Sequence, residues 1–324
     1  MDQTRPVFLG QMASARAGDT RALGRLLTLV ERSPSGLPEL FEAAATSPGK
    51  AHRIGITGPP GAGKSTLTSA VVSLRRAEGE RVAVLAVDPS SPFSGGALLG
   101  DRLRMLEHVA DRGVYIRSMA SRGHLGGLAV AAALAVEVLD AVGFDTVIIE
   151  TVGVGQNEVE VARVADTTIL VTAPGTGDEV QAVKAGIMEI ADVLVLNKAD
   201  HPASELAARQ LRNALGLRAN SARGDWAVPL LCTTATASSG VAELSAAVRA
   251  HGRWLAESGS AWRRRRDRAA KQILEIASGQ VKELLEVPPE LVTEVAERRM
   301  DPWSAARLVT SRLGAAAAPH SGAR

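Results

Sequence analysis

The feature that most constrains the fold of this 324-residue chain is a series of short apolar runs between residues 53 and 251. Helical stretches separate the runs, which read RIGITG, RVAVLAVD, VYIRS, DTVIIET, TTILVTA, DVLVLNK and VPLLCTT. Strands of this kind, without polar alternation, are typical of a parallel sheet that is buried on both faces. The pattern therefore predicts an α/β fold with a mostly parallel sheet flanked by helices.

Sequence of helical character flanks this region on both sides. Near the start, Leu23, Leu26, Leu27 and Val30 recur at helical spacing, which predicts an amphipathic helix. Beyond the last apolar run the sequence is again helical, and it is rich in charge. We expect four parts in chain order: an N-terminal helical extension at 1–50, an α/β domain at 51–256, a C-terminal helical region at 257–314 and a disordered tail at 315–324.

Composition and charge exclude several classes of protein. The formal net charge of +2 argues against a chain built around a polyanion, so we expect no nucleic-acid partner. The longest apolar stretch, Leu125 to Val136, has about twelve residues, whereas a membrane-spanning helix needs about 20. The N-terminus lacks the apolar segment of a secretory signal, and the single Cys232 excludes an internal disulfide. These features favour a cytoplasmic protein that is not held in a membrane.

A glycine-rich loop is the first chemical signal. The run GPPGAGKS matches the pattern GxxxxGK[ST], follows the strand RIGIT and opens the helix STLTSAVVSLRRAEG, which is the context that a phosphate-binding loop requires. Its glycines let the backbone approach phosphate oxygens, and its amides and the helix N-terminus face them. We expect Lys64 to reach the β- and γ-phosphates and Ser65 to ligate Mg²⁺. The expected contacts of the nucleotide here are Gly58, Pro59, Pro60, Gly61, Ala62, Gly63, Lys64, Ser65 and Thr66.

A second motif indicates which base is bound. The NKxD sequence at residues 197–200 follows the apolar strand DVLVLN. The Asp200 carboxylate can accept hydrogen bonds from the imino group and the amine of guanine, and adenine offers no such pair of donors. Asn197 is expected to tie this loop to the phosphate loop, and the stem of Lys198 to pack on the ring. The later run CTTATASSG is expected to offer backbone amides to the guanine carbonyl at Thr234, Ala235 and Thr236. The sequence therefore predicts GTP rather than ATP.

Residues 149–157, IETVGVGQN, match a second phosphate-sensing loop. Glu150 ends an apolar strand, and Gly153 follows at the spacing of a DxxG motif, with Glu in the place of Asp. A carboxylate here holds Mg²⁺ directly or through water, and the Gly153 amide is expected to bond the γ-phosphate. Small signalling GTPases place the water-orienting glutamine directly after this glycine, where this chain has Val154. We therefore expect slow hydrolysis without a partner, and the sequence leaves open whether Gln156 reaches the nucleotide.

Together with the phosphate loop, several longer runs resemble the MeaB/ArgK/methylmalonic-aciduria-type-A family of P-loop GTPases. They read AVLAVDPSSPFSGGALLGDRLRM, RGHLGG, ETVGVGQNEVEV and GDEVQAVKAGIMEIADVLVLNKAD, and the resemblance covers about residues 20–310. It implies a SIMIBI-class GTPase that uses GTP/GDP and Mg²⁺ and forms a homodimer through its C-terminal helices. It also implies a chaperone that gates adenosylcobalamin loading and protects or reactivates a cobalamin-dependent acyl-CoA mutase, above all methylmalonyl-CoA mutase.

The resemblance also implies roles for residues outside the nucleotide motifs. The family's first switch corresponds to the segment from Asp88 to Asp101, and its third switch to residues 173–184. Both aspartates become candidate ligands of Mg²⁺ or of its water shell, with the N-cap of the next helix as the alternative for Asp101. For the third switch, a plain strand-to-helix connection is the alternative. The metal candidates are Ser65, Asp88, Asp101 and Glu150, and the catalytic candidates are Lys64, Asp101, Glu150 and Gly153.

Two other functions are compatible with a P-loop. An old name for the same family suggests a kinase of a periplasmic amino-acid-binding transport protein, which would need an acceptor-binding domain that no region of the sequence suggests. A metal-insertion GTPase should carry paired Cys or His ligands, but the six histidines show no paired spacing. A kinase would transfer phosphate to an acceptor, whereas a chaperone would form a complex that depends on GTP.

A basic run lies near the start of the C-terminal helical region. It reads WRRRRDR, from Trp262 to Arg268, and is compatible with RNA or lipid binding. It leads directly into a helical pattern and has no aromatic platforms beside it on which bases could stack. We therefore interpret the run as a solvated helix face or a dimer contact.

The assignment of the base can be tested at Asp200. In Asp200→Asn the amide complements the carbonyl of xanthine in place of the amine of guanine. Affinity for GTP should fall sharply relative to affinity for xanthosine triphosphate, as measured by competition binding. An unchanged preference for GTP would contradict the assignment.

Overall fold

A computed structural model describes residues 4–32, 38–45, 49–89, 105–121, 127–151, 157–175, 187–219 and 226–316. Contacts divide the chain into two units, Met1–Ala270 and Lys271–Arg324. The first unit contains the sheet, and the described part of the second consists of helices and their connections. Each unit is considered by itself.

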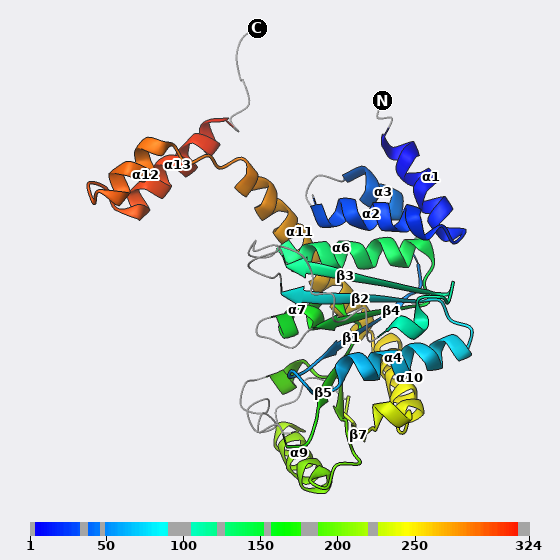
Figure 1. The fold of residues 1–324 in the computed structure, drawn as a ribbon. Helices are drawn as coiled ribbons and strands as arrows, with labels where there is room; N and C mark the ends of the chain where they lie inside the picture. Colours follow the sequence, from blue (N-terminus) through cyan, green and yellow to red (C-terminus); the bar gives the residue numbers. More distant parts are fainter. Residues whose placement is uncertain are drawn as a thin grey trace. The chain divides into compact units, whose positions relative to one another are not determined.

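The predicted parallel sheet is confirmed. Among the described residues, seven strands pair in the order β3-β2-β4-β1-β5-β6-β7, and each pair of neighbours is parallel (Figure 1). In chain order the strands are β1 (His52–Thr57), β2 (Val82–Pro89), β3 (Val114–Ser121), β4 (Thr146–Thr151), β5 (Thr167–Thr172), β6 (Val193–Leu196) and β7 (Leu230–Cys232). Because the strands run the same way, their carboxyl ends meet at one edge, where open α/β sheets bind ligands.

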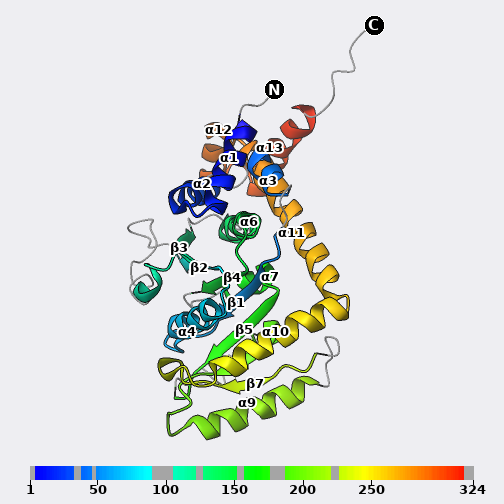
Figure 2. The ribbon, with the colours of Figure 1, turned by 90° about the vertical axis from the view of Figure 1, so that its right-hand side faces the viewer.

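Helices cover both faces of the sheet, as the unbroken apolar strands predict. Along β6, Val193 and Val195 join one buried cluster, while Leu194 and Leu196 join another on the opposite face. The first cluster includes α4 (Lys64–Ala77) and α10 (Val241–Glu257), which contact each other and lie side by side in Figure 2. The helices on the other face are α6 (Gly127–Val142), α7 (Asn157–Val164) and α9 (Ser204–Ala219).

The N-terminal helices add a further layer over α6. They are α1 (Thr4–Arg16), α2 (Thr20–Arg32) and α3 (Pro38–Ala45), and each contacts α6 (Figure 1). Leu23, Leu26, Leu27 and Val30 are all buried, so the helical spacing in this part of the sequence is confirmed. None of the described helices has the length and apolar character that a bilayer span requires.

The C-terminal region is helical. α11 (Ser260–Glu283) begins in the first unit, and α12 (Pro289–Ala296) and α13 (Pro302–Ala316) belong to the second and contact each other. Asp301 caps α13, because its Oδ1 accepts the backbone N–H groups of Trp303 and Ser304 at 2.9 and 3.0 Å. Proline at the first position of both helices fits the preference for proline at a helix start.

The basic run on α11 divides between two faces of the helix. Arg264 donates to both carboxylate oxygens of Asp192 at 2.7 and 3.0 Å, and Arg268 donates to Asp166 at 2.8 Å. Residues four apart share a helix face, so both arginines reach the amino edge of the sheet, where Asp166 precedes β5 and Asp192 precedes β6. The interpretation as a solvated face or dimer contact is therefore wrong for these two arginines.

A pair of histidines, one of them fully buried, lies beside this ion-pair cluster. The Thr167 hydroxyl bridges His52 Nε2 at 2.8 Å and His251 Nδ1 at 2.9 Å. His251 is fully buried, and its ring lies 4.9 Å from the ring of Trp226 and 5.6 Å from that of Trp254. Burial lowers the pKa of His251 from 6.5 to about 4, although Asp192 acts in the opposite direction. The imidazole is therefore neutral in the folded protein at neutral pH.

The depressed pKa of His251 makes stability depend on pH. Between about pH 6.5 and 4, His251 binds a proton in the unfolded chain but not in the folded chain. The contribution of the neutral imidazole to the free energy of unfolding is therefore complete above pH 6.5 and is lost as the pH falls towards 4. The free energy of unfolding should drop by about 3 kcal/mol over this range from His251 alone. Urea unfolding of His251→Asn should show a flatter dependence on pH, and the same slope as the wild type would contradict the assignment.

Candidate nucleotide site

The glycine-rich loop connects β1 to α4 in the conformation of a phosphate-binding loop. Gly58 and Gly63 have φ values of 142° and 88°, which side chains disfavour. A Cβ on Gly58 would lie 2.0 Å from the carbonyl oxygen of Val171, and one on Gly63 would lie 2.4 Å from Asn197 Nδ2. The buried Lys64 donates from Nζ to the carbonyl oxygens of Gly58 at 2.8 Å and Pro59 at 3.0 Å. The ammonium group therefore lies against the loop that would surround a phosphate.

A hydroxyl and a carboxylate meet at the start of α4. Ser65 Oγ donates to Glu150 Oε1 at 2.6 Å, and both side chains are buried, at 5% and 4% exposure. Ser65 is the second residue of α4, and Glu150 lies near the carboxyl end of β4. Hydroxyl and carboxylate oxygens are the ligands that Mg²⁺ prefers, usually with several waters retained. The donor set therefore fits one side of a magnesium site.

The other metal and switch candidates are only partly within the described residues. Asp88 belongs to β2, which pairs with β4 in a register that sets Ala86 opposite Glu150. The backbone of Asp88 therefore lies at the same sheet edge as Glu150. Asp101, Gly153, Val154 and Gln156 lie outside the described residues, as do residues 176–184 of the third-switch segment.

Asn197 joins the base loop to two other loops. Its Nδ2 donates to the Ala62 carbonyl of the phosphate loop at 2.9 Å, which is the tie expected from the sequence. Its Oδ1 accepts the Thr233 hydroxyl and the Ala235 backbone N–H, both at 3.1 Å. Asn197 and Thr233 are 3% and 1% exposed, so these hydrogen bonds are shielded from water. One side chain thus fixes the relative positions of three loops.

The remaining base-loop residues lie around this junction. Lys198 has φ 56°, a left-handed conformation that turns the chain, and the Ala199 N–H donates to the Thr233 carbonyl at 3.0 Å. Asp200 Oδ1 accepts the Thr234 hydroxyl at 3.4 Å. Ala235 and Thr236 lie in the short 3₁₀ helix η3 (Ala235–Ala237). The Thr234 N–H donates to the Ser239 carbonyl at 3.0 Å and the Ala235 N–H to Asn197 Oδ1, so the prediction that these two amides face guanine is wrong.

Thr233 is a site residue that the sequence interpretation missed. It holds Asn197 through its hydroxyl and Ala199 through its carbonyl, yet it precedes the residues that were expected to contact guanine. The signal that the sequence offered was a polar residue directly after the edge strand β7, at a position where an apolar residue would otherwise be expected.

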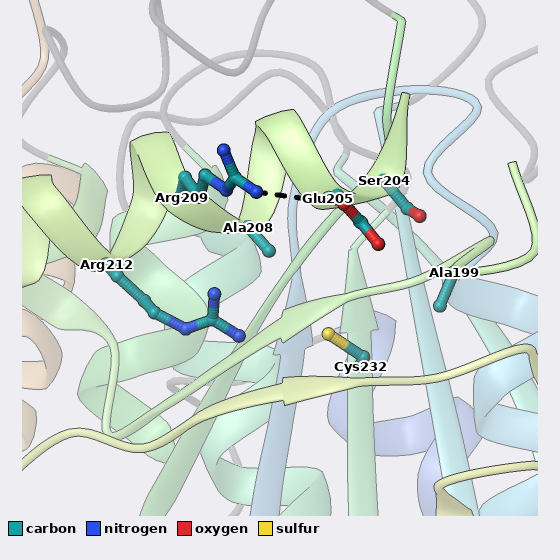
Figure 3. A pocket seen from close by; sticks show the side chains of 7 residues that line it. All are labelled: Ala199, Ser204, Glu205, Ala208, Arg209, Arg212 and Cys232. Carbon is teal, nitrogen blue, oxygen red and sulfur yellow. Dashed lines mark ion pairs between the residues drawn. The ribbon is translucent and has the colours of Figure 1, made fainter. Parts of the chain in front are cut away.

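A surface groove adjoins the outer side of the base loop. It has a volume of about 400 Å³, lies between α9 and β7, and is lined by residues that include Ala199, Arg209, Arg212 and Cys232 (Figure 3). The Arg209 guanidinium lies 3.9 Å from the Glu205 carboxylate, and both side chains are exposed. No residue of the phosphate loop lines this groove, and Ala199 is the residue that the groove shares with the base loop.

The sequence matches the model of a known protein family. The profile described as "Methylmalonyl Co-A mutase-associated GTPase MeaB" matches residues 23–289. A relative from Pyrococcus horikoshii is 45% identical over 303 residues, which are 92% of this chain and 96% of that protein. The GTPase ArgK of Escherichia coli is 45% identical over 189 residues, which are 57% of each chain.

One solved structure is similar over nearly the whole chain. The crystal structure of LAO/AO transport system kinase is 26% identical, has a TM-score of 0.70, and covers 97% of this chain and 99% of its own. The chain therefore shares its overall fold with a structure that is known from experiment.

The junction at Asn197 can be tested by removing its side chain. Asn197→Ala leaves the Ala62 carbonyl, the Thr233 hydroxyl and the Ala235 N–H without their partner, so the free energy of unfolding should fall by about 3 kcal/mol. The control Thr234→Ala removes one exposed hydroxyl and should cost less than about 0.5 kcal/mol. Equal losses of the free energy of unfolding in the two variants would show that the Asn197 hydrogen bonds do not hold the loops of the site together.

Proposed function

This chain belongs to the MeaB family of GTPases, and from that membership and the geometry of its site we propose that it is a chaperone of a cobalamin-dependent acyl-CoA mutase. In this proposal GTP binding and hydrolysis gate the loading of adenosylcobalamin and protect or reactivate the mutase. Methylmalonyl-CoA mutase is the first candidate partner, because the family description names a methylmalonyl-CoA mutase. The cytoplasm is the proposed location, with neither nucleic acid nor membrane as a partner.

The single observation that carries the nucleotide part is the Asn197 junction. It connects the phosphate loop at Ala62 with the base loops at Thr233 and Ala235, so one nucleotide spanning these loops would contact all of them. Phosphates would take backbone N–H groups of the non-proline residues between Gly58 and Thr66 and the Lys64 ammonium, since Pro59 and Pro60 carry no N–H. Guanine would take the Asp200 carboxylate and the Thr236 amide, with the Lys198 stem on its face, because the Thr234 and Ala235 amides donate to Ser239 and Asn197.

On the metal side, Ser65 and Glu150 support the proposal of a magnesium ion. Asp88 and Asp101 would complete its oxygen ligands or hold its waters. When bound, Mg²⁺ neutralises charge that develops on the transferred phosphate. The residues of the chain then act around it: Lys64 holds the β- and γ-phosphates, Glu150 accepts the hydrogen bond of Ser65, and the Gly153 amide would bond the γ-phosphate.

Slow intrinsic hydrolysis is part of the proposal. Val154 cannot orient a water molecule through hydrogen bonds, and Gln156 lies two residues further along the chain. A partner that supplies a polar or cationic group at this position would accelerate the reaction. We propose that the mutase, contacted through the third-switch segment at residues 173–184, is that partner.

Two observations bear on the alternative functions. Among the described residues, no group of three or more His, Cys, Asp or Glu side chains is placed to hold a metal ion. The solved structure with a kinase name keeps the transport-protein kinase as the second candidate. That function predicts phosphate transfer to a protein acceptor.

We also propose a homodimer that uses the second unit. Its helices and connections expose large apolar side chains, with Leu284, Val292 and Trp303 at 69%, 54% and 81% exposure. Apolar side chains exposed together are typical of a protein interface. A second copy of the same chain would cover them.

The chaperone function is tested by complex formation with purified methylmalonyl-CoA mutase. Retention of the mutase on the immobilised chain should differ between a non-hydrolysable GTP analogue and GDP, because the switch segments respond to the γ-phosphate. Lys64→Ala, which weakens triphosphate binding, should remove the difference and serves as the control. Equal retention of the mutase with the GTP analogue and with GDP would contradict the proposal, and so would transfer of labelled γ-phosphate to a transport protein.

A further inference from the structure

The groove between α9 and β7 has no part in the function proposed above. Its volume of about 400 Å³ lies within the range of small-molecule sites, which is about 300–1,000 Å³. Five of the residues that line it belong to α9, and Ala199 of the base loop and Cys232 of β7 complete the lining. One helix therefore determines most of the chemistry that the groove offers to a ligand.

Small side chains keep the groove open. Ser204, Ala208 and Arg212 follow one another at intervals of four residues, so they share one face of α9. Ala208 is 4% exposed and closes the floor of the groove, and Ser204 is partly buried beside it. A long side chain at either of these two positions would occupy the space that a ligand needs.

The charged side chains of the lining are two arginines and one glutamate, which leave one positive charge in excess. In Figure 3 the Arg212 side chain extends from α9 into the space between the helix and β7, and the Cys232 sulfur points into the same space. Among the described residues, the Arg212 guanidinium has no hydrogen-bond or ion-pair partner. Arg209 lies 3.9 Å from Glu205 with both side chains exposed, and such a surface pair is weak. Both guanidinium groups are therefore available to an anion.

The arrangement of these groups favours a phosphate ester. Arg209 and Arg212 are three residues apart on α9, and side chains at this spacing begin about 5–6 Å from each other, so both can reach one phosphate group. A guanidinium donates two parallel hydrogen bonds to phosphate oxygens, which fits its planar fork. The Glu205 carboxylate would repel a second anionic group. Ala199 and Ala208 offer methyl groups to an uncharged body.

We propose that the groove between α9 and β7 binds a small molecule that carries one phosphate group on an uncharged body. Arg209 and Arg212 hold the phosphate, and the body lies against Ala199, Ala208 and Cys232. This binding site goes beyond the proposed chaperone function and does not depend on it, because none of its contacts requires GTP or a mutase.

The chain carries its own reporter for the groove. Cys232 is the single cysteine of the sequence, and its side chain is exposed, so alkylation by the neutral reagent iodoacetamide measures access to the groove. Phenyl phosphate serves as the probe. At about ten times its Kd only about a tenth of the grooves are empty, and the rate of alkylation should fall about tenfold.

Arg212→Ala should raise the concentration of phenyl phosphate that gives half of this protection about tenfold, because a charge-assisted hydrogen bond is lost. Arg212 is exposed, so the variant should fold as the wild type does. Each variant is compared with its own rate of alkylation in the absence of the probe. Arg265→Ala is the matched control, since it removes an exposed arginine of α11 that does not line the groove, and it should be protected like the wild type.

Lys64→Ala separates the groove from the phosphate loop, which also offers contacts to an anion. Protection of Cys232 should persist in this variant. An alkylation rate that phenyl phosphate leaves unchanged in the wild type would overturn the inference, and so would equal protection of Arg212→Ala and Arg265→Ala. Loss of protection in Lys64→Ala would place the probe in the phosphate loop and would also overturn it.

Discussion

The parallel direction of all seven described strands is the constraint on which the rest of the molecule depends. It brings the ends of β1, β4, β5, β6 and β7 to one edge, so that loops far apart in sequence become neighbours. Asn197 then holds the arrangement together, because its amide can satisfy a carbonyl of one loop and a hydroxyl and an N–H of another. The glycines of the phosphate loop are needed for the same reason, since a Cβ on Gly63 would strike this amide.

The opposite edge of the sheet carries two aspartates that hold the start of α11. Asp166 and Asp192 precede adjacent strands, and each binds an arginine of α11. Burial would raise the pKa of Asp166, but Arg268 and Arg53 hold it below its ordinary value. The first turns of α11 are thus fixed to the strands whose other ends carry the base loop and the third-switch segment.

Much of the fold and the centre of the site follow from the sequence, because they depend on local patterns. Unbroken apolar runs specify strands, and the GxxxxGK[ST] and NKxD motifs specify loops whose chemistry is contained in a few consecutive residues. The roles of Thr233 and Arg264 could not be predicted in this way. Their partners lie 36 and 72 residues away, and only strand register and helix packing bring them together. The arginine run was misinterpreted because its composition does not tell which of its residues face the sheet.

If the chain is a mutase chaperone, its rate of GTP hydrolysis should respond to the mutase. Single-turnover hydrolysis of GTP with and without methylmalonyl-CoA mutase, at a mutase concentration that saturates the complex, measures this response. The chain alone should hydrolyse GTP slowly and should release inorganic phosphate faster with the mutase, because the partner supplies the group that the Val154 side chain lacks. Equal rates in the presence of a bound mutase would contradict the chaperone function.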